Sequence, residues 1–171
     1  RFANSKINIF EKYFLIHGGG LAVENALKIS FDWKKIITRN NDRNEEDLEV
    51  ISFHEGFHGV TGYTISLSDN DLKTQGFPKF NWPKFDAPAI SFSNPENPAS
   101  AVRTEEDRSL NNIRNYIRER GSNKIASIII ELIQGGGGDR HISSYFILEL
   151  RKICTENDIL FIVDEVQTGF G

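Results

Sequence analysis

Short apolar runs alternate along this chain with segments in which apolar residues recur at helical spacing. The runs at residues 13–16, 48–53, 125–133 and 159–163 are rich in β-branched and aromatic side chains and predict strands. The segments between them predict helices, because apolar residues return every three or four positions. This alternation is typical of an α/β fold in three layers, with a mostly parallel sheet flanked by helices.

The first predicted helix follows three glycines and turns one apolar face to the core. Its apolar positions are Ala22, Ala26, Ile29 and Trp33, with Val23 and Leu27 beside them. The polar residues 39–47 that follow predict a surface loop. Residues 69–98 carry all five prolines and many aromatic side chains, which predicts an irregular but ordered excursion.

Cap residues bound the two later helices. Thr104 is the expected N-cap of the second helix and Gly121 its C-cap, while Ser143 or Ser144 caps the third. The positions expected to face the core are Leu110, Ile113 and Ile117 in the second helix, and Phe146, Ile147, Leu150 and Cys154 in the third.

Composition narrows the class of protein. The chain has 171 residues, 39% of them hydrophobic and 26% charged, and a net charge of −4 without a basic cluster. We therefore expect no nucleic-acid partner and no membrane association. The single cysteine, Cys154, excludes an internal disulfide and favours a reducing, cytoplasmic location. The absence of methionine, and a start on Arg1, indicate an internal fragment of a longer protein.

Four segments with unusual residues lie where the predicted strands end. They are residues 18–20, 54–59, 134–139 and 164–167. In open α/β sheets, ligands bind beyond the carboxyl ends of the strands. The sequence therefore predicts a binding site formed by these four segments.

Two interpretations of the glycine triplet, residues 18–20, remain open. Backbone N–H groups at a helix N-terminus can bind a phosphate, and glycine lets the anion approach closely. A tight turn that needs positive φ is the simpler explanation for a glycine triplet taken alone. The triplet is not a Walker A loop, and Glu24 and Asn25 exclude a G-x-G-x-x-G fingerprint.

Residues 54–58 match the zinc-protease pattern H-E-x-x-H, with histidines at His54 and His58 and a glutamate at Glu55. That chemistry needs both histidines on one face of a helix. Here the segment follows a strand and contains Gly56, so we expect no metal site and keep a zinc hydrolase only as the least favoured alternative.

Two carboxylates stand within or at the end of apolar runs that predict buried strands. Glu131 interrupts the run 125–133, and Asp164 ends the run 159–163. A buried carboxylate is costly unless it is paired with a cation or a strong donor. Both therefore indicate a polar site at this edge of the sheet.

Taken together, these segments resemble the class III, fold-type I pyridoxal-phosphate aminotransferases over nearly the whole chain after residue 14. The resemblance is carried by residues 18–28, Phe57-His58-Gly59, residues 76–83, residues 131–135 and Asp164-Glu165-Val166-Gln167-Thr168-Gly169. Within the family, residues 22–28 and 76–83 look most like the lysine 6-aminotransferases, which remove the ε-amino group of L-lysine.

The resemblance implies pyridoxal 5'-phosphate as cofactor and gives each site residue a role. Gly19 and Gly20 bind the cofactor phosphate, Phe57 stacks on the pyridine ring, and His58 belongs to the same cofactor site. Asp164 pairs with the ring nitrogen and Gln167 with the phenolic oxygen. Asp164 and Glu131 are the expected catalytic residues in this chain, and no metal is implied.

The resemblance also implies what lies outside this chain. Residues 1–171 correspond to part of the large, cofactor-binding domain, without the N-terminal arm, the small domain and the region of the Schiff-base lysine. The implied partners are an amino donor, a 2-oxo acid acceptor such as 2-oxoglutarate, and a second copy in a homodimer. Three positions depart from the family's pattern: Val60 replaces an arginine that binds the substrate α-carboxylate, Gly136 a glutamate, and Leu132 a proline. A catalytically inactive scaffold or binding protein with this fold is therefore the main alternative.

Overall fold

A computed structural model describes residues 12–38, 48–90, 92 and 101–169. Its main sheet has four parallel strands in the order β2 (Lys84–Phe85), β1 (Glu49–Phe53), β3 (Ile125–Glu131) and β6 (Leu160–Asp164). A small antiparallel pair, β4 (Ile133–Gln134) and β5 (Arg140–His141), follows β3. The predicted loop 39–47 and most of residues 91–98 lie outside the described residues.

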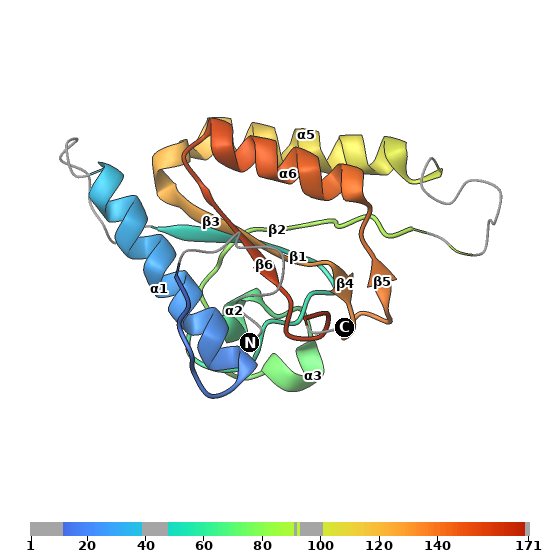
Figure 1. Cartoon of the computed structure of the whole chain (residues 1–171). Coiled ribbons are helices and arrows are strands. Elements are labelled where there is room, and N and C mark those ends of the chain that lie inside the picture. Colours follow the sequence, from blue (N-terminus) through green and yellow to red (C-terminus); the bar gives the residue numbers. More distant parts are fainter. Residues whose placement is uncertain (1–11, 39–47, 91, 93–100, 170–171) are drawn as a thin grey trace.

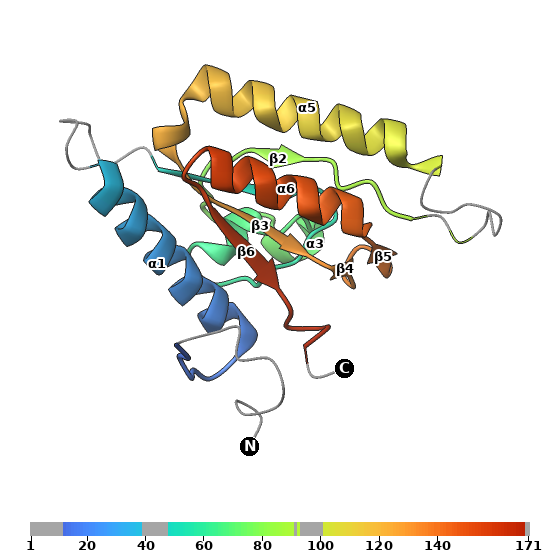
Figure 2. The ribbon, with the colours of Figure 1, turned by 45° about the horizontal axis from the view of Figure 1, so that its top comes forward.

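Helices cover both faces of this sheet (Figure 1). On one face lie α5 (Arg103–Arg120) and α6 (Ser144–Glu156), joined to the strands by the short 3-10 helix Ser122–Lys124 and by turns. On the other lie α1 (Gly19–Thr38) and α2 (Thr64–Leu67), with α3 (Asp71–Thr74) beyond them. Figure 2 shows β3 and β6 side by side with their carboxyl ends pointing the same way. The predicted three-layer, mostly parallel α/β fold is confirmed.

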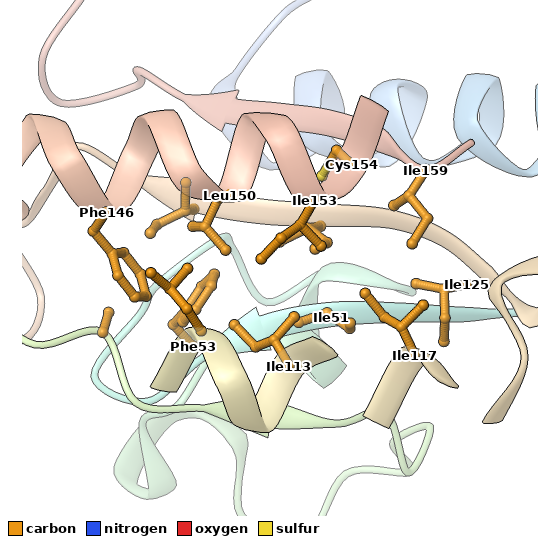
Figure 3. Packing of buried hydrophobic residues seen from close by; sticks show 14 residues of the cluster. Ile51, Phe53, Ile113, Ile117, Ile125, Phe146, Leu150, Ile153, Cys154 and Ile159 are labelled. Carbon is orange, nitrogen blue, oxygen red and sulfur yellow. The ribbon is translucent and has the colours of Figure 1, made fainter. Parts of the chain in front are cut away.

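Strand β3 forms the centre of the core because all seven of its residues are buried. Ile128 and Ile130 pack into the cluster beneath α5 and α6, part of which Figure 3 shows, whereas Ile129 packs against α1. Successive side chains of a strand point to opposite faces, so a strand covered on both sides is apolar throughout. The buried residues of α5 and α6 include Leu110, Ile113, Ile117, Phe146, Leu150 and Cys154, as predicted, while Ile147 is only partly buried.

Three strand predictions need correction. Residues 13–16 form no strand, and Leu15 is 95% exposed, because no described strand pairs with this run. The third strand ends at Glu131 rather than at residue 133, where the chain leaves the sheet for the β4–β5 pair. Residues Leu160–Val163 of β6 are half-buried, not buried on both faces, because among the described residues β6 pairs only with β3 and forms an edge.

Helix α1 has the predicted periodicity with its buried face displaced by one residue. The buried positions are Val23, Glu24, Leu27, Ser30 and Lys34, whereas Ala22 and Ile29 are exposed. Ser30 and Lys34 tolerate burial because each has a hydrogen-bond partner: Ser127 for the hydroxyl and the carbonyl of Asp158 for the ammonium.

The helix caps follow the predictions in two of three cases. The hydroxyl of Ser143 accepts a hydrogen bond from the N–H of Phe146, and Gly121 ends α5 at φ +92°. Thr104 lies inside α5 instead of capping it, because that helix begins two residues earlier than predicted, after Val102, which makes no side-chain cap bond.

The aromatic excursion is ordered by stacking in the part of it that the structure describes. Tyr63, Phe80 and Trp82 form a stack, with the rings of Phe80 and Trp82 4.8 Å apart and inclined by 11°. Phe31 of α1 contacts Tyr63 and Trp82 and so fastens the excursion to the helix layer.

Lys34 carries the main pH-sensitive contact between α1 and the turn before β6. Its side chain is 1% exposed, and burial lowers its pKa from 10.5 to about 8, against the opposing effect of the Asp158 and Cys154 charges. Between these two pH values the unfolded chain binds more protons than the folded one. The free energy of unfolding therefore rises with pH over this window, and Lys34 adds no pH dependence below it.

We expect the difference in unfolding free energy between wild type and Lys34→Met to grow by about 1 kcal/mol over the pH unit above 8. Urea unfolding of both proteins, at pH 8 and one unit higher, measures this difference. Cys154, whose pKa burial raises from 9 to about 12, opposes the trend only above pH 9 and is common to both proteins. A difference that stays constant, or shrinks, contradicts the prediction.

Candidate active site

One cavity of about 420 Å³ lies at the carboxyl ends of β1, β3 and β6, beside the N-terminus of α1. This volume suits a small cofactor or substrate. All of the site residues predicted from the sequence line it: Gly19, Gly20, Phe57, His58, Glu131, Asp164 and Gln167. The other lining residues are Gly59, Asn70, Lys73, Gly135, Gly136, Asp139 and Val166. The four segments with unusual residues therefore do meet at one place.

The three glycines at the start of α1 answer different needs. Gly18 has φ +93°, as the turn interpretation requires, with open space around it. At Gly19 a Cβ would lie 2.8 Å from Cγ1 of Val166, so this glycine permits the close approach of the loop after β6. Gly20 faces the cavity with only ordinary contacts to Thr61. Since the first N–H groups of a helix lack intrahelical partners, this end of α1 can bind an anion.

Glu24 of α1 holds the loop that closes this side of the cavity. Its carboxylate accepts hydrogen bonds from the hydroxyl of Thr61 and from the N–H groups of Tyr63 and Thr64. Gly59 belongs to the same loop and has φ +111°. A Cβ at this position would lie 3.1 Å from Cα of Gly20. These contacts attach the loop firmly to helix α1.

The pair of His58 and Asp164 forms the buried floor of the cavity. Nδ1 of His58 lies 2.8 Å from Oδ2 of Asp164, and Oδ1 of Asp164 accepts the N–H of Val166 at 3.1 Å. The two side chains are 1% and 4% exposed. The carboxylate is thereby oriented, and each oxygen keeps a lone pair for a further donor. Nε2 of His58 is buried and has no partner among the described residues.

Glu131 contacts the predicted stacking residue through the backbone. Its Oε2 accepts the N–H of Phe57 at 2.8 Å. Burial is the main cause that raises the pKa of Glu131, opposed by this hydrogen bond and by nearby His58. Gly136 also lies close to Phe57, and a Cβ there would lie 3.1 Å from Cβ of Phe57. Glu131 therefore holds the backbone of Phe57, and Gly136 leaves room for its side chain.

The zinc-protease interpretation of residues 54–58 is wrong. Glu55 has φ +62° and the segment is a turn, so the two histidines do not share a helix face. His54 contacts Asp69 at 3.2 Å on the surface, whereas His58 is buried against Asp164. Within the residues that the structure describes, no group of three His, Cys, Asp or Glu side chains could hold a metal ion.

Sequence reasoning missed several lining residues. Asp139 follows the four glycines and lay within a segment already singled out, so its position was a usable signal. Asn70 and Lys73 come from the irregular excursion, where no periodicity indicates which side chains turn inward. Val60, at the position where the family carries an arginine, is 49% exposed and is not among the lining residues.

The groups that line the cavity match those of pyridoxal phosphate. A helix N-terminus suits the phosphate, the Phe57 ring offers an aromatic face, and the oriented carboxylate of Asp164 suits a protonated ring nitrogen. An open parallel sheet that gathers these three features round one cavity defines the class: a pyridoxal-phosphate-dependent transferase.

Within that class, the chain belongs to the class-III aminotransferases, whose family model matches residues 3–171. It is 42% identical over 163 residues to the L-lysine-epsilon aminotransferase of Amycolatopsis lactamdurans, covering 92% of this chain and 35% of that protein. It is 40% identical over 161 residues to the enzyme of the same name from Streptomyces clavuligerus, covering 94% and 35%. The resemblance predicted from the motifs is thus confirmed.

Solved structures agree. A lysine aminotransferase from Mycobacterium tuberculosis superimposes with a TM-score of 0.84 at 41% identity, over 92% of this chain and 36% of that one. A PLP-bound amine transaminase from an uncultivated Pseudomonas species gives 0.74 at 28% identity, over 91% and 34%. Family and structures together indicate pyridoxal phosphate as the cofactor. The chain spans about a third of the length of the relatives it matches.

Proposed function

We propose that this chain is the cofactor-binding part of a longer aminotransferase that removes the ε-amino group of L-lysine and passes it to a 2-oxo acid, with 2-oxoglutarate as the acceptor. The observation that carries the proposal is that Gly19, Gly20, Phe57, Asp164 and Gln167 line the same cavity. Identity of 40–42% to L-lysine-epsilon aminotransferases supports the substrate.

Three groups of this chain would hold the cofactor. The free N–H groups at Gly19 and Gly20 would bind its phosphate, where the helix dipole also favours negative charge. Phe57, whose backbone N–H is bound by Glu131, would cover one face of the ring. Gln167, which lines the cavity beyond β6, would donate its amide N–H to the phenolic oxygen.

Asp164 would control the charge of the cofactor ring. When bound, the cofactor supplies an electron sink for the negative charge that develops on the substrate carbon. Asp164 would hold the proton on the ring nitrogen, so that the ring stays cationic. The contacts with Nδ1 of His58 and the N–H of Val166 hold this carboxylate in one orientation.

The proposal extends to the whole protein. We expect the Schiff-base lysine, an N-terminal arm and a small domain in the remainder of that protein, and residues 1–171 to be part of its large domain. We also expect a homodimer in the cytoplasm. No helix among the described residues is long and apolar enough to cross a membrane.

The test uses the full-length protein that contains this chain. We expect it to retain pyridoxal phosphate through purification, and to form glutamate from 2-oxoglutarate when L-lysine is supplied. The comparison substrate is 4-aminobutyrate, since 4-aminobutyrate aminotransferases are also relatives, for example that of Emericella nidulans at 38% identity. Faster turnover of 4-aminobutyrate contradicts the lysine assignment. Failure to bind the cofactor supports the scaffold alternative instead.

A further inference from the structure

The rim of the cavity carries two charged side chains to which the catalytic proposal gives no role. They are Lys73, from the last turn of α3, and Asp139, from the turn between β4 and β5. Both line the cavity and both are exposed. Among the described lining residues Lys73 is the one lysine or arginine, so it is the cavity's source of permanent positive charge.

The charged groups on the cavity floor, in contrast, already have hydrogen-bond partners. Asp164 is committed to His58 and Val166, and Glu131 to the N–H of Phe57. Within the described part of the chain, neither Lys73 nor Asp139 has a hydrogen bond or ion pair from its charged group. The rim therefore presents one cation and one anion that remain available to a ligand.

Lys73 is also held in place. Its Nζ lies 4.6 Å from the centre of the Phe57 ring, a cation–π distance. The contact favours side-chain conformations in which the exposed ammonium stays beside the Phe57 ring. Because Phe57 is the expected stacking residue, the ammonium lies beside the ring that would cover the cofactor. A group bound by Lys73 would thus belong to the same ligand as the reacting group, but at its far end.

We propose that Lys73 and Asp139 form the subsite for the amino-acid end of the substrate, Lys73 binding its α-carboxylate and Asp139 its α-ammonium. An amino donor that reacts through its distal amine carries its α-carboxylate and α-ammonium at the other end of the molecule. These two groups therefore lie away from the cavity floor. The inference rests on the proposed function and adds the residues that select its substrate. Charge-assisted hydrogen bonds of this kind give both affinity and orientation.

Three amines of equal chain length test the subsite in the full-length holoenzyme. L-Lysine carries both charged groups, 6-aminohexanoate lacks the α-amine, and hexylamine lacks both. We expect Lys73→Met to raise KM at least about tenfold for L-lysine and 6-aminohexanoate, and to leave hexylamine within about twofold. Asp139→Asn should raise KM for L-lysine alone. In both variants kcat should change little, since the contact is the same in ground and transition states.

Lys79→Met is the matched control, because Lys79 is exposed on the same excursion but does not line the cavity. It should leave all three substrates unchanged. An equal loss for hexylamine in Lys73→Met, or no loss for L-lysine, overturns the proposal.

A binding measurement separates this inference from the catalytic proposal. Hexanoate has the carboxylate but no amine to react, so its calorimetric binding to the holoenzyme does not depend on turnover. We expect Lys73→Met to weaken hexanoate binding at least about tenfold, and Asp139→Asn to leave it unchanged. If the wild-type enzyme turns over no lysine, the proposed function fails, while the hexanoate result still decides whether Lys73 binds a carboxylate. Equal hexanoate binding by wild type and Lys73→Met refutes that role.

Discussion

Replacing Asp164 by asparagine in the full-length enzyme is expected to lower kcat by about three orders of magnitude, because losing a buried charge partner costs several kcal/mol. The amide keeps the volume of the side chain and can still accept the N–H of Val166. It carries no negative charge, however, and so cannot hold a proton on the ring nitrogen. Steady-state rates with L-lysine, and the amount of retained cofactor, measure the effect.

Asp71→Asn is the control for Asp164→Asn, since Asp71 is an exposed residue of α3 outside the cavity lining. It should retain wild-type kcat. Circular dichroism should show both variants folded, because the amide has the same shape as the carboxylate and still accepts the N–H of Val166. Wild-type kcat in Asp164→Asn would mean that the buried carboxylate serves the fold rather than the chemistry.

Gly59→Ala is expected to destabilise the protein by about 3 kcal/mol, the sum of backbone strain at positive φ and overpacking. The residue has φ +111°, and its Cβ would lie 2.9 Å from Oγ1 of Thr64 and 3.1 Å from Cα of Gly20. Neither neighbour moves easily, because Thr64 is tied to Glu24 and Gly20 belongs to α1. Displacing Gly20 should also weaken binding of the cofactor phosphate.

Gly76→Ala separates the two contributions. Gly76 has φ +79° with nothing within 4 Å of the added carbon, so only the strain of about 1–2 kcal/mol remains. Urea unfolding of both variants gives the difference, and titration with pyridoxal phosphate gives the effect on the site. Equal destabilisation at the two positions would show that α1 and the loop after β1 move apart at little cost in free energy.

The sequence was sufficient to predict the core of the fold and the floor of the site. Carboxylates inside apolar runs are costly, and that cost alone singled out Glu131 and Asp164. The buried face of α1 was misplaced because Ser30 and Lys34 are polar, and both have partners about a hundred residues away, at Ser127 and Asp158, that help to make their burial acceptable. Such long-range hydrogen bonds leave no periodic signal in the helix itself.

The rim of the site and the run 13–16 could not be predicted for a related reason. Lys73 lines the cavity because the aromatic excursion folds back over Phe57, and nothing in its local sequence requires that path. An apolar run such as residues 13–16 becomes a strand only beside a strand with which it can pair, and no such strand lies among the described residues. Both outcomes depend on neighbours in space rather than on residue type.

The close approach of Gly19 to Val166 has a consequence for how this family can vary. These two residues lie nearly 150 positions apart, yet no free volume separates them, since a single added carbon at residue 19 would lie 2.8 Å from a methyl group of Val166. Their sizes are therefore coupled. Among aligned class-III sequences, a relative with a larger residue at the position of Gly19 should carry a smaller one at the position of Val166, and this compensating pair marks where the anion-binding helix and the aspartate loop evolve as one unit.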